Sequence, residues 1–402
     1  MGCAVQAGGA RSRAFYGSAV LLLGAFVCLL FVARPAAAQE GEAGTNLGVD
    51  VHGFVSQGFL LSTDNNYLAK SRRGSFEFTE VGLNFTKSLG DNLRAGMQIF
   101  TRDLGPIGNY RPQFDWFYLD YRFADWLGVR AGRTKLPFGL YNETSDVDAV
   151  RVPILLPPSL YPQENREFLL AQTGGELYGY VPIGAAGALD YRLYGGTIFL
   201  ATTSLTAPGL TLNEVDVPYL AGGRAMWLTP LDGLQVGASF QLLRIDLKLR
   251  ADGLGDVLAR YPVKLAVGSL EYAAHDLLLA AEFSRWRIDA KVRPVAGGAF
   301  DSHQTQTRWY VMGSYRVTPW FSPGAYYSVF DLGQPNQNTR ANYQQDAAVT
   351  FRYDLTANWI AKLEGHYMRG TAGLSRSLNS NRPLGDLPRT WGVALVKTTV
   401  FF

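Results

Sequence analysis

The residues best suited to chemistry in this chain are acidic side chains in one long segment and charged side chains in the segments around it. The segment from Leu136 to Leu170 contains five prolines, and its charged residues are Glu143, Asp146, Asp148, Arg151, Glu164, Arg166 and Glu167. Apolar and polar residues alternate in the surrounding segments, whose polar positions include Arg94, Arg102, Asp120, Arg122, Arg130, Arg308, Arg316, Arg352, Lys362 and Glu364. An acidic loop facing a basic wall across water would set an electric field that orients polar solutes and sorts ions by charge.

The same charges allow a second interpretation, in which the arginines pair with acids and simply fill the interior. The two interpretations are compatible with one another, and both stay open at this point. Whether the side chains of Arg133 and Lys135 point into the barrel or outward is open as well. Both residues alternate in step with the apolar residues Val129 and Ala131, which are expected to point outward. Either a β-bulge turns these two side chains inward or they lie on the rim.

Groups for catalysis or metal binding are sparse. An enzyme would need a nucleophile, a base and an orienting group in one place. Of the four histidines, only His366, two residues after Glu364, falls where it would join an interior network, and no G-x-S-x-G motif accompanies it. We therefore predict no catalytic residue, no metal site and no cofactor.

The elements that must position the charged residues are strands. Period-two alternation is clear over residues 93–99, 117–123, 234–241 and 347–354. We predict strands near residues 49–61, 75–87, 92–103, 113–123, 127–135, 171–181, 188–199, 219–228, 233–249, 261–273, 276–289, 305–317, 320–330, 345–356, 358–369 and 389–402. Because no apolar run after residue 38 approaches the roughly twenty residues of a membrane helix, the pattern predicts a 16-stranded antiparallel transmembrane β-barrel.

The connections between these strands alternate between two kinds. Tight turns are predicted near residues 89–92, 124–126, 183–187, 230–233, 274–276, 318–320 and 357–358. Long loops are predicted near residues 62–74, 104–112, 136–170, 200–218, 250–260, 290–304, 331–344 and 370–388. This alternation is typical of bacterial outer-membrane barrels, with both termini on the periplasmic, short-turn side.

Tryptophan gives a second indication, because its ring prefers the membrane interface. Four tryptophans lie at or beside tight turns, namely Trp126, Trp227, Trp320 and Trp359, and four lie near loop ends, namely Trp116, Trp286, Trp309 and Trp391. We interpret them as two aromatic girdles.

The first residues resemble a secretory leader. Arg11 and Arg13 precede an apolar stretch, and the small residues Ala36 to Ala38 follow it, which predicts a cleaved signal peptide over residues 1–38 and a periplasmic lead-in over residues 39–48. The length of the apolar stretch keeps a membrane anchor as an alternative. Both cysteines lie in this leader, so residues 39–402 contain no thiol.

The charge balance excludes one class of partner. Removing residues 1–38 takes away three arginines and no acids, so 37 − 3 leaves 34 basic residues against 34 acidic ones. A nucleic-acid-binding protein needs a clustered positive surface. We therefore predict no nucleic-acid partner.

Two motifs and the final residue resemble a known family. The residues Gly132-Arg-Thr-Lys-Leu-Pro-Phe-Gly139 and Gln172-Thr-Gly-Gly-Glu-Leu-Tyr-Gly179 are similar to motifs of the phosphate-selective porin O and P family, and Phe402 resembles the carboxyl-terminal assembly signal of outer-membrane proteins. The resemblance implies a sixteen-stranded porin barrel over residues 49–402, commonly trimeric, in which the third long loop narrows the channel. It also implies lipid, lipopolysaccharide and the barrel-assembly machinery as partners.

The sequence thus predicts a water-filled channel for small polar or charged solutes. Glu143, Asp146, Asp148 and Arg151 are its predicted constriction residues. A phosphate-type anion channel is the first alternative, although an acidic loop would repel a dianion. A barrel enzyme and an adhesin are the less favoured alternatives.

Overall fold

Sixteen strands form one closed barrel in the computed structural model of the chain, which describes residues 48–163, 169–199, 210–251, 255–294, 298–334 and 339–402. The first eight strands are β1 (Asp50–Ser62), β2 (Phe78–Ser88), β3 (Leu93–Leu104), β4 (Gln113–Ala124), β5 (Leu127–Lys135), β6 (Ala171–Pro182), β7 (Ala188–Thr197) and β8 (Leu210–Leu228). The other eight are β9 (Leu234–Ala251), β10 (Gly255–Ala274), β11 (Leu277–Pro294), β12 (Phe300–Tyr315), β13 (Phe321–Asp331), β14 (Tyr343–Thr356), β15 (Trp359–Gly370) and β16 (Thr390–Phe401). Short 3-10 helices in the described connections are η1 (Ser71–Arg73), η2 (Asn142–Thr144), η3 (Asp148–Val150), η4 (Gly184–Ala186), η6 (Arg340–Asn342) and η7 (Leu384–Asp386).

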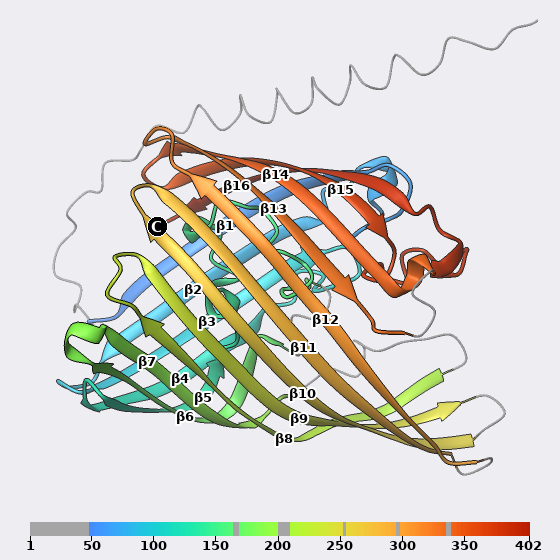
Figure 1. Cartoon of the computed structure of the whole chain (residues 1–402), viewed down its shortest axis with the longest axis horizontal. Helices are drawn as coiled ribbons and strands as arrows, with labels where there is room; N and C mark the ends of the chain where they lie inside the picture. Colours follow the sequence, from blue (N-terminus) through green and yellow to red (C-terminus); the bar gives the residue numbers. More distant parts are fainter. Residues whose placement is uncertain (1–47, 164–168, 200–209, 252–254, 295–297, 335–338) are drawn as a thin grey trace, which may run out of the picture. The chain divides into compact units, whose positions relative to one another are not determined.

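Every strand pairs antiparallel with its neighbours in the sequence, and β1 pairs with β16 to close the ring (Figure 1). This confirms the predicted sixteen-stranded antiparallel barrel. The predicted signal peptide falls on residues outside the described part, as does the lead-in up to residue 47, so both stay predictions.

The seam between the first and last strands is tight. The backbones of Gly53 and Phe402 exchange two hydrogen bonds of 3.0 Å each. A Cβ atom at position 53 would lie 2.7 Å from the Phe402 ring, so any larger residue there would require this ring to shift.

The predicted alternation of connections is confirmed at the turn end of the barrel. Each odd-numbered strand after β1 follows its predecessor through a short turn. In the turn between β10 and β11, His275 and Asp276 have φ values of 55° and 61°, the left-handed pair that a two-residue hairpin of this twist requires.

At the loop end, the predicted loops near residues 200–218, 250–260 and 290–304 are largely wrong. Strands β8 to β12 contain 16 to 20 residues each and project well beyond the other strands (Figure 1). The extensions carry charged pairs on their outward face, such as Glu214 with Lys248 at 2.6 Å and Arg293 with Asp301 at 2.5 Å. Because charge replaces the lipid-facing apolar residues there, the sequence pattern resembles a loop while the strands continue.

Along the long strands, the apolar residues change from the outward face to the inward face, and the polar residues change in the opposite sense. Near the turn end, outward residues are apolar, with Phe240 47% and Phe283 54% exposed, while inward Gln241 and Ser284 are buried. Further toward the loops, outward positions hold Lys264 and other exposed charges, and inward positions are apolar. This exchange marks the edge of the apolar band on the outer surface.

The turn-side tryptophan girdle agrees with the structure, and most of the loop-side girdle is wrong. Trp126, Trp227 and Trp320 are exposed at 58%, 44% and 56% at the turn end. Of the loop-side residues, Trp286 and Trp391 are buried inside, at 9% and 2% exposure. Trp116 stacks on Tyr118 and donates to Gln98, and Trp309 alone of the four lies outward, beside Tyr327. Tryptophan at a strand end thus indicates height along the barrel, whereas parity decides which side it faces.

Among the described residues, no helix is long and apolar enough to cross a membrane.

Candidate functional site

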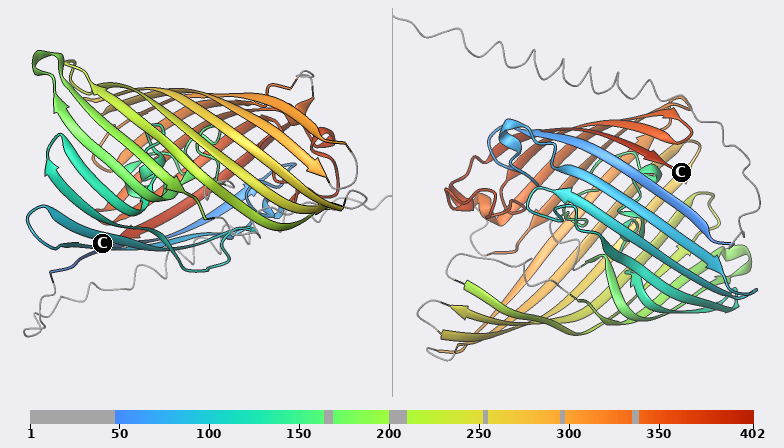
Figure 2. Two further views of the ribbon diagram at one scale, coloured as in Figure 1. Left: turned by 90° about the horizontal axis from the view of Figure 1, so that it is seen from below. Right: turned by 180° about the vertical axis from the view of Figure 1, so that it is seen from behind.

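The described part of the long connection between β5 and β6 runs through the interior of the barrel (Figure 2). A hydrogen bond of 2.8 Å from Leu136 N to Leu170 O draws its two ends together. Between them the segment reaches opposite walls: Gly139 N donates to Ser239 Oγ on β9 at 2.9 Å, and Ile154 N donates to Glu364 on β15 at 2.6 Å. We call residues 136–163, the described part of this connection before the gap, the inner loop. Glu164, Arg166 and Glu167 lie outside the described residues.

The first attachment of the inner loop is centred on Asp148 in η3. Its carboxylate lies 2.9 Å from Lys362 Nζ on β15 and 3.7 Å from Lys397 Nζ on β16, and it accepts a hydrogen bond of 2.8 Å from Thr399 Oγ1. Arg151, in the loop itself, is 3.5 Å away. Both lysines are almost fully buried, so the three charges depend on one another.

The electrostatics of this attachment favour the charged carboxylate. Burial by itself would raise the pKa of Asp148, but Lys362, Lys397 and Arg151 outweigh it and hold the pKa below its ordinary value. Asp148 therefore stays ionised over the whole physiological range.

The same wall also binds the backbone of the inner loop. Lys362 Nζ donates to the carbonyl oxygens of Asp148 at 2.7 Å and Arg151 at 2.9 Å. Arg352 on β14 donates to the carbonyl oxygens of Ala149 at 2.5 Å and Arg151 at 3.1 Å. Glu364 accepts from two consecutive loop amides, the second from Leu155 at 3.0 Å. The predicted residues Arg352, Lys362 and Glu364 therefore meet the predicted loop directly.

A second attachment holds Glu143 and Asp146 against the opposite wall. The Glu143 carboxylate lies 2.6 Å from Arg192 on β7 and 2.9 Å from Arg224 on β8. Lys135 pairs with Asp146 and donates to the Glu143 carbonyl at 2.8 Å. Lys135 thus reaches the inner loop.

The neighbouring Arg133 contacts the adjacent strand β4. Its Nε donates to the Asp115 carbonyl on β4 at 2.8 Å.

A third attachment surrounds Glu282 on β11, which is 3% exposed. This carboxylate accepts hydrogen bonds from Ser269 at 2.5 Å, Tyr310 at 2.7 Å and Leu140 N at 3.0 Å, and also from the Tyr161 hydroxyl. Tyr161 and Leu140 belong to the inner loop. A fully hydrogen-bonded buried carboxylate of this kind rigidifies what it joins.

Apolar packing fills the space between the loop and the long strands. The loop contributes Leu136, Phe138, Leu156, Leu160 and Tyr161, and the wall contributes Leu243, Val263, Leu265, Trp286 and Tyr310. The lumen beside β8 to β12 is therefore apolar over part of its height. The sequence analysis did not predict this apolar part of the wall.

Pockets lie on both sides of the inner loop. On the loop-end side, a pocket of about 250 Å³ is lined by Pro158, Ser159, Pro162 and the wall residue Arg308. On the turn-end side, residues 149–152 line a pocket of about 410 Å³ with Arg316 and Arg352, and Gly139 and Leu140 line one of about 290 Å³ with Arg224. The inner loop separates these spaces.

The other predicted pore residues fall into two groups. Asp120 is 5% exposed and pairs with Arg94 at 2.9 Å and Arg130 at 3.4 Å, as the interior-pairing interpretation expects. Arg122 and Arg316 are about two-thirds exposed and lie beside the turn acids Asp125 and Asp276, at 3.9 Å and 4.0 Å. These last two residues therefore belong to the turn-side mouth.

Two of the predicted pore residues meet the far end of the inner loop. Arg102 donates to the Gln163 carbonyl at 3.4 Å, and Arg308 donates to the Ser159 carbonyl at 3.1 Å.

Several site residues escaped prediction, namely Glu80, Arg192, Arg224, Glu282, Lys397 and Thr399. The alternation in the last strand could have identified Lys397. Its neighbours Val396, Thr398 and Val400 lie on the outward side, so Lys397 points into the barrel. Glu80 pairs with Lys397 at 2.7 Å across the β1 seam, a contact that only barrel closure creates. Among the described residues, no group of three or more His, Cys, Asp or Glu is arranged to hold a metal ion.

Comparison with known proteins finds solved structures of similar fold. No protein-family model and no curated protein matches the sequence. The outer-membrane channel DcaP of Acinetobacter baumannii matches with a TM-score of 0.55 at 11% identity, covering 88% of this chain and 97% of that one. The anion-selective porin from Comamonas acidovorans matches with a TM-score of 0.51 at 13% identity, covering 88% and 99%. The trimer form of the outer-membrane protein OmpT of Vibrio cholerae matches with a TM-score of 0.51 at 11% identity, covering 88% and 99%. At these identities the likeness establishes the fold.

Proposed function

We propose that this chain, whose fold is that of the bacterial outer-membrane porins, spans the outer membrane and forms a channel for the passive diffusion of small polar solutes. The observation that supports the proposal is the position of the inner loop. One segment contacts lumen-facing residues on β9, β11 and β15, and it lines pockets on both of its sides. A segment held across the interior in this way sets the size of what passes.

Charge pairing within the constriction favours a channel of weak selectivity. Glu143, Asp146 and Asp148 each lie against at least one basic side chain, so the acidic loop and the basic wall largely compensate each other. A phosphate-selective channel is the second candidate, suggested by the family resemblance. The acids of the loop weigh against it, because they oppose the entry of a dianion.

An enzymatic role receives no support from the interior histidine. His366 Nδ1 lies 3.0 Å from Asp346 and Nε2 lies 3.0 Å from Glu364. Both ring nitrogens therefore face carboxylates, and neither is placed to take a proton from a hydroxyl nucleophile. We propose that the histidine is a structural member of the wall.

Liposome swelling tests the channel proposal. Liposomes containing the folded barrel are expected to swell in neutral sugars, fastest with pentoses and more slowly as the sugar becomes larger, because the inner loop limits the cross-section. Liposomes with heat-unfolded protein are the matched control. Equal swelling of the two preparations would remove the proposal.

We also propose that outer-leaflet lipopolysaccharide binds the outward face of β10 and β11. Lys264 lies directly opposite Arg287 in the strand pair, and Arg260 lies directly opposite Lys291. Like charges directly opposite one another destabilise a sheet unless a counter-charge lies between them. Among the described residues, Lys264 and the exposed Arg285 make no ion pair, so this surface, just beyond the apolar band, offers cations to lipid phosphates.

Replacing Lys264 and Arg285 with glutamine tests the lipid proposal. Added lipopolysaccharide is expected to stabilise the wild-type barrel against urea, and the double variant is expected to lose about 1 kcal/mol of that gain for each charge removed. Lys248→Gln is the matched control, because Lys248 is already paired with Glu214. A lipopolysaccharide effect of equal size in the double variant and in wild type would contradict the proposal.

The terminal residue is proposed to act in assembly. Phe402 is 63% exposed, and its backbone completes the seam with Gly53. Deleting Phe402 removes both this closure and the assembly signal, so we expect little heat-modifiable barrel in the outer membrane. Phe402→Tyr, which keeps the aromatic ring, is expected to assemble. Normal assembly of the deletion variant would exclude this role.

A homotrimer is proposed for the assembled state. Five apolar residues project from the outward face of the short strand β4 at 41% to 61% exposure, namely Phe114, Phe117, Leu119, Tyr121 and Phe123. The trimer form of the Vibrio cholerae protein shows that this fold supports such an assembly. Crosslinking in native membranes is expected to give a threefold product, and monomer alone would exclude the proposal.

A further inference from the structure

One cation in the lumen is buried without an acidic partner. Arg308 on β12 is 7% exposed. It donates to the Ser159 carbonyl at 3.1 Å and to Gln306 Oε1 at 2.5 Å, and its Nε has no hydrogen-bond partner. Among the described residues, Arg308 is not within ion-pair distance of any carboxylate, whereas the arginines and lysines at Asp148 and Glu143 all are.

The guanidinium is held in place from both sides. Its central carbon lies 3.6 Å from the ring centre of Trp286 and 4.3 Å from that of Phe330. Stacking on aromatic rings orients a guanidinium and offsets part of the loss of water, but it supplies no negative charge and no acceptor for the Nε–H group. A buried charge without a partner is costly for folding, so the arrangement is one that an anion would complete.

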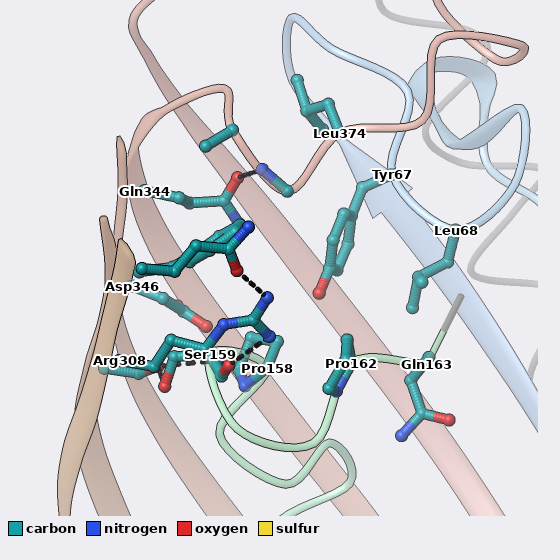
Figure 3. Close-up of a pocket in the computed structure, with 15 residues that line it drawn as sticks. Tyr67, Leu68, Pro158, Ser159, Pro162, Gln163, Arg308, Gln344, Asp346 and Leu374 are labelled. Carbon is teal, nitrogen blue, oxygen red and sulfur yellow. Dashed lines mark hydrogen bonds between the residues drawn. The ribbon is translucent and has the colours of Figure 1, made fainter. Parts of the chain in front are cut away.

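The cation lines the pocket of about 250 Å³ on the loop-end side of the inner loop. Figure 3 shows Arg308 at one wall, with Ser159 and Pro158 of the inner loop beside it and Tyr67, Pro162 and Gln163 across the space. The remaining polar lining includes one carboxylate, that of Asp346, and several hydroxyl and amide groups, among them Ser328, Gln306 and Gln344. Hydroxyl and amide groups of this kind bind the hydroxyls of a polyol.

The sign and size of the local charge limit what the pocket accepts. Asp346 also lines the pocket, and it shares His366 with the buried Glu364. The two carboxylates repel an anion, and they repel a dianion more strongly than a monoanion. The single guanidinium therefore favours a ligand with one negative charge over a ligand with two. A planar carboxylate also matches the geometry of a guanidinium fork.

We propose that this pocket is a binding subsite for small hydroxylated carboxylates, with Arg308 holding the carboxylate and the amide and hydroxyl lining holding the hydroxyls. The proposal rests on the proposed channel function, and it makes Arg308 a residue that selects among the solutes that reach the inner loop. It concerns equilibrium binding, which can be measured whether or not the barrel conducts.

Isothermal titration of the folded barrel in detergent tests the subsite, with sodium gluconate as the probe. Gluconate is expected to bind in a saturable manner, while sorbitol, its uncharged counterpart, and inorganic phosphate bind at least about tenfold more weakly. Arg308→Gln is expected to weaken gluconate binding about 10- to 100-fold, and Arg308→Lys, which keeps the charge without the fork, to weaken it less. Arg316→Gln, one residue beyond the same strand and exposed at the turn-side mouth, is the matched control and is expected to bind as wild type does.

A second variant covers the case in which Arg308→Gln does not fold. Ala372→Phe places a ring in the pocket from the loop between β15 and β16 and leaves Arg308 intact, and it is expected to abolish gluconate binding. Gluconate binding by either folded variant at wild-type strength would overturn the proposal, as would phosphate binding equal to gluconate binding. Liposome swelling without gluconate binding would contradict the subsite proposal and support the channel proposal. Gluconate binding without swelling would contradict the channel proposal and support the subsite proposal.

Discussion

Replacing Asp148 with asparagine is expected to lower the free energy of unfolding of the barrel by about 3 to 5 kcal/mol, because it leaves Lys362 buried without a counter-charge and leaves Lys397 with Glu80 alone. The change is also expected to release η3 from the wall, so the channel should conduct more and fluctuate more. Urea unfolding in detergent or lipid vesicles measures the first effect, and single-channel recording measures the second.

Two further variants separate this effect from a general loss of an acid. Asp276→Asn removes an exposed carboxylate that lies 4.0 Å from Arg316 at the turn end, and it is expected to change stability by less than about 1 kcal/mol. Combining Asp148→Asn with Lys362→Met removes the unpaired charge together with its partner, so part of the stability is expected to return. A double variant no more stable than Asp148→Asn would show that the loss arises elsewhere.

The same ion pairs determine how stability depends on pH. Because the pKa of Asp148 is lowered in the folded state, its contribution is complete above the ordinary aspartate value, near 3.8, and is lost as the pH falls through the lower folded value. We expect no loss of stability from this group between about pH 8 and about pH 5. A fall in the unfolding midpoint over that range that disappears in Asp148→Asn would contradict the assignment.

Neutralising Glu143, Asp146 and Asp148 together is expected to shift ion selectivity toward anions. In wild type these acids compensate bases that include Lys135, Arg192 and Lys362, so their removal leaves a constriction with a net positive charge. A unit charge at about 4 Å is worth roughly 1 kcal/mol even in water, so three charges are expected to change the anion-to-cation permeability ratio about tenfold or more. Reversal potentials across planar bilayers in a salt gradient measure the ratio.

The matched control removes three acids from the outer surface. Asp256, Asp289 and Asp301 lie on the outward face of the long strands, and their replacement by asparagine is expected to leave the reversal potential unchanged. If unfolding of the first triple variant obscures the result, Glu143→Gln with Asp146→Asn keeps the Asp148 attachment intact. A permeability ratio equal to wild type in both folded variants would exclude the inner loop from selectivity.

The sequence predicted the barrel well because its signals are local. Period-two alternation within each strand and turn residues between strands are enough to count sixteen elements and to orient them. The same rule failed over residues 210–218 and 255–260, where strands leave the membrane and their outward residues become charged. Outward charge and inward apolar residues reverse the expected pattern, and only the pairing of neighbouring strands shows that the sheet continues.

The sequence indicated which charged residues belong to the site, but not which of these residues pair with one another. Parity and loop length indicated Asp148, Lys362, Arg352 and Glu364, which the structure brings together where the inner loop meets the wall. They could not indicate that Glu143 pairs with Arg192, since that contact depends on how the inner loop folds back. Tyr161 at the Glu282 carboxylate lies more than a hundred residues from it in the chain, and no periodicity encodes such a distance.

Single-channel recording of the purified wild-type barrel in planar bilayers tests the central claim most directly. Discrete, ohmic conductance steps are expected in potassium chloride, with larger steps for Asp148→Asn, because that variant frees the inner loop from the wall formed by β15 and β16. A folded, inserted barrel that passes no current above the bare bilayer, in wild type and variant alike, would contradict the account.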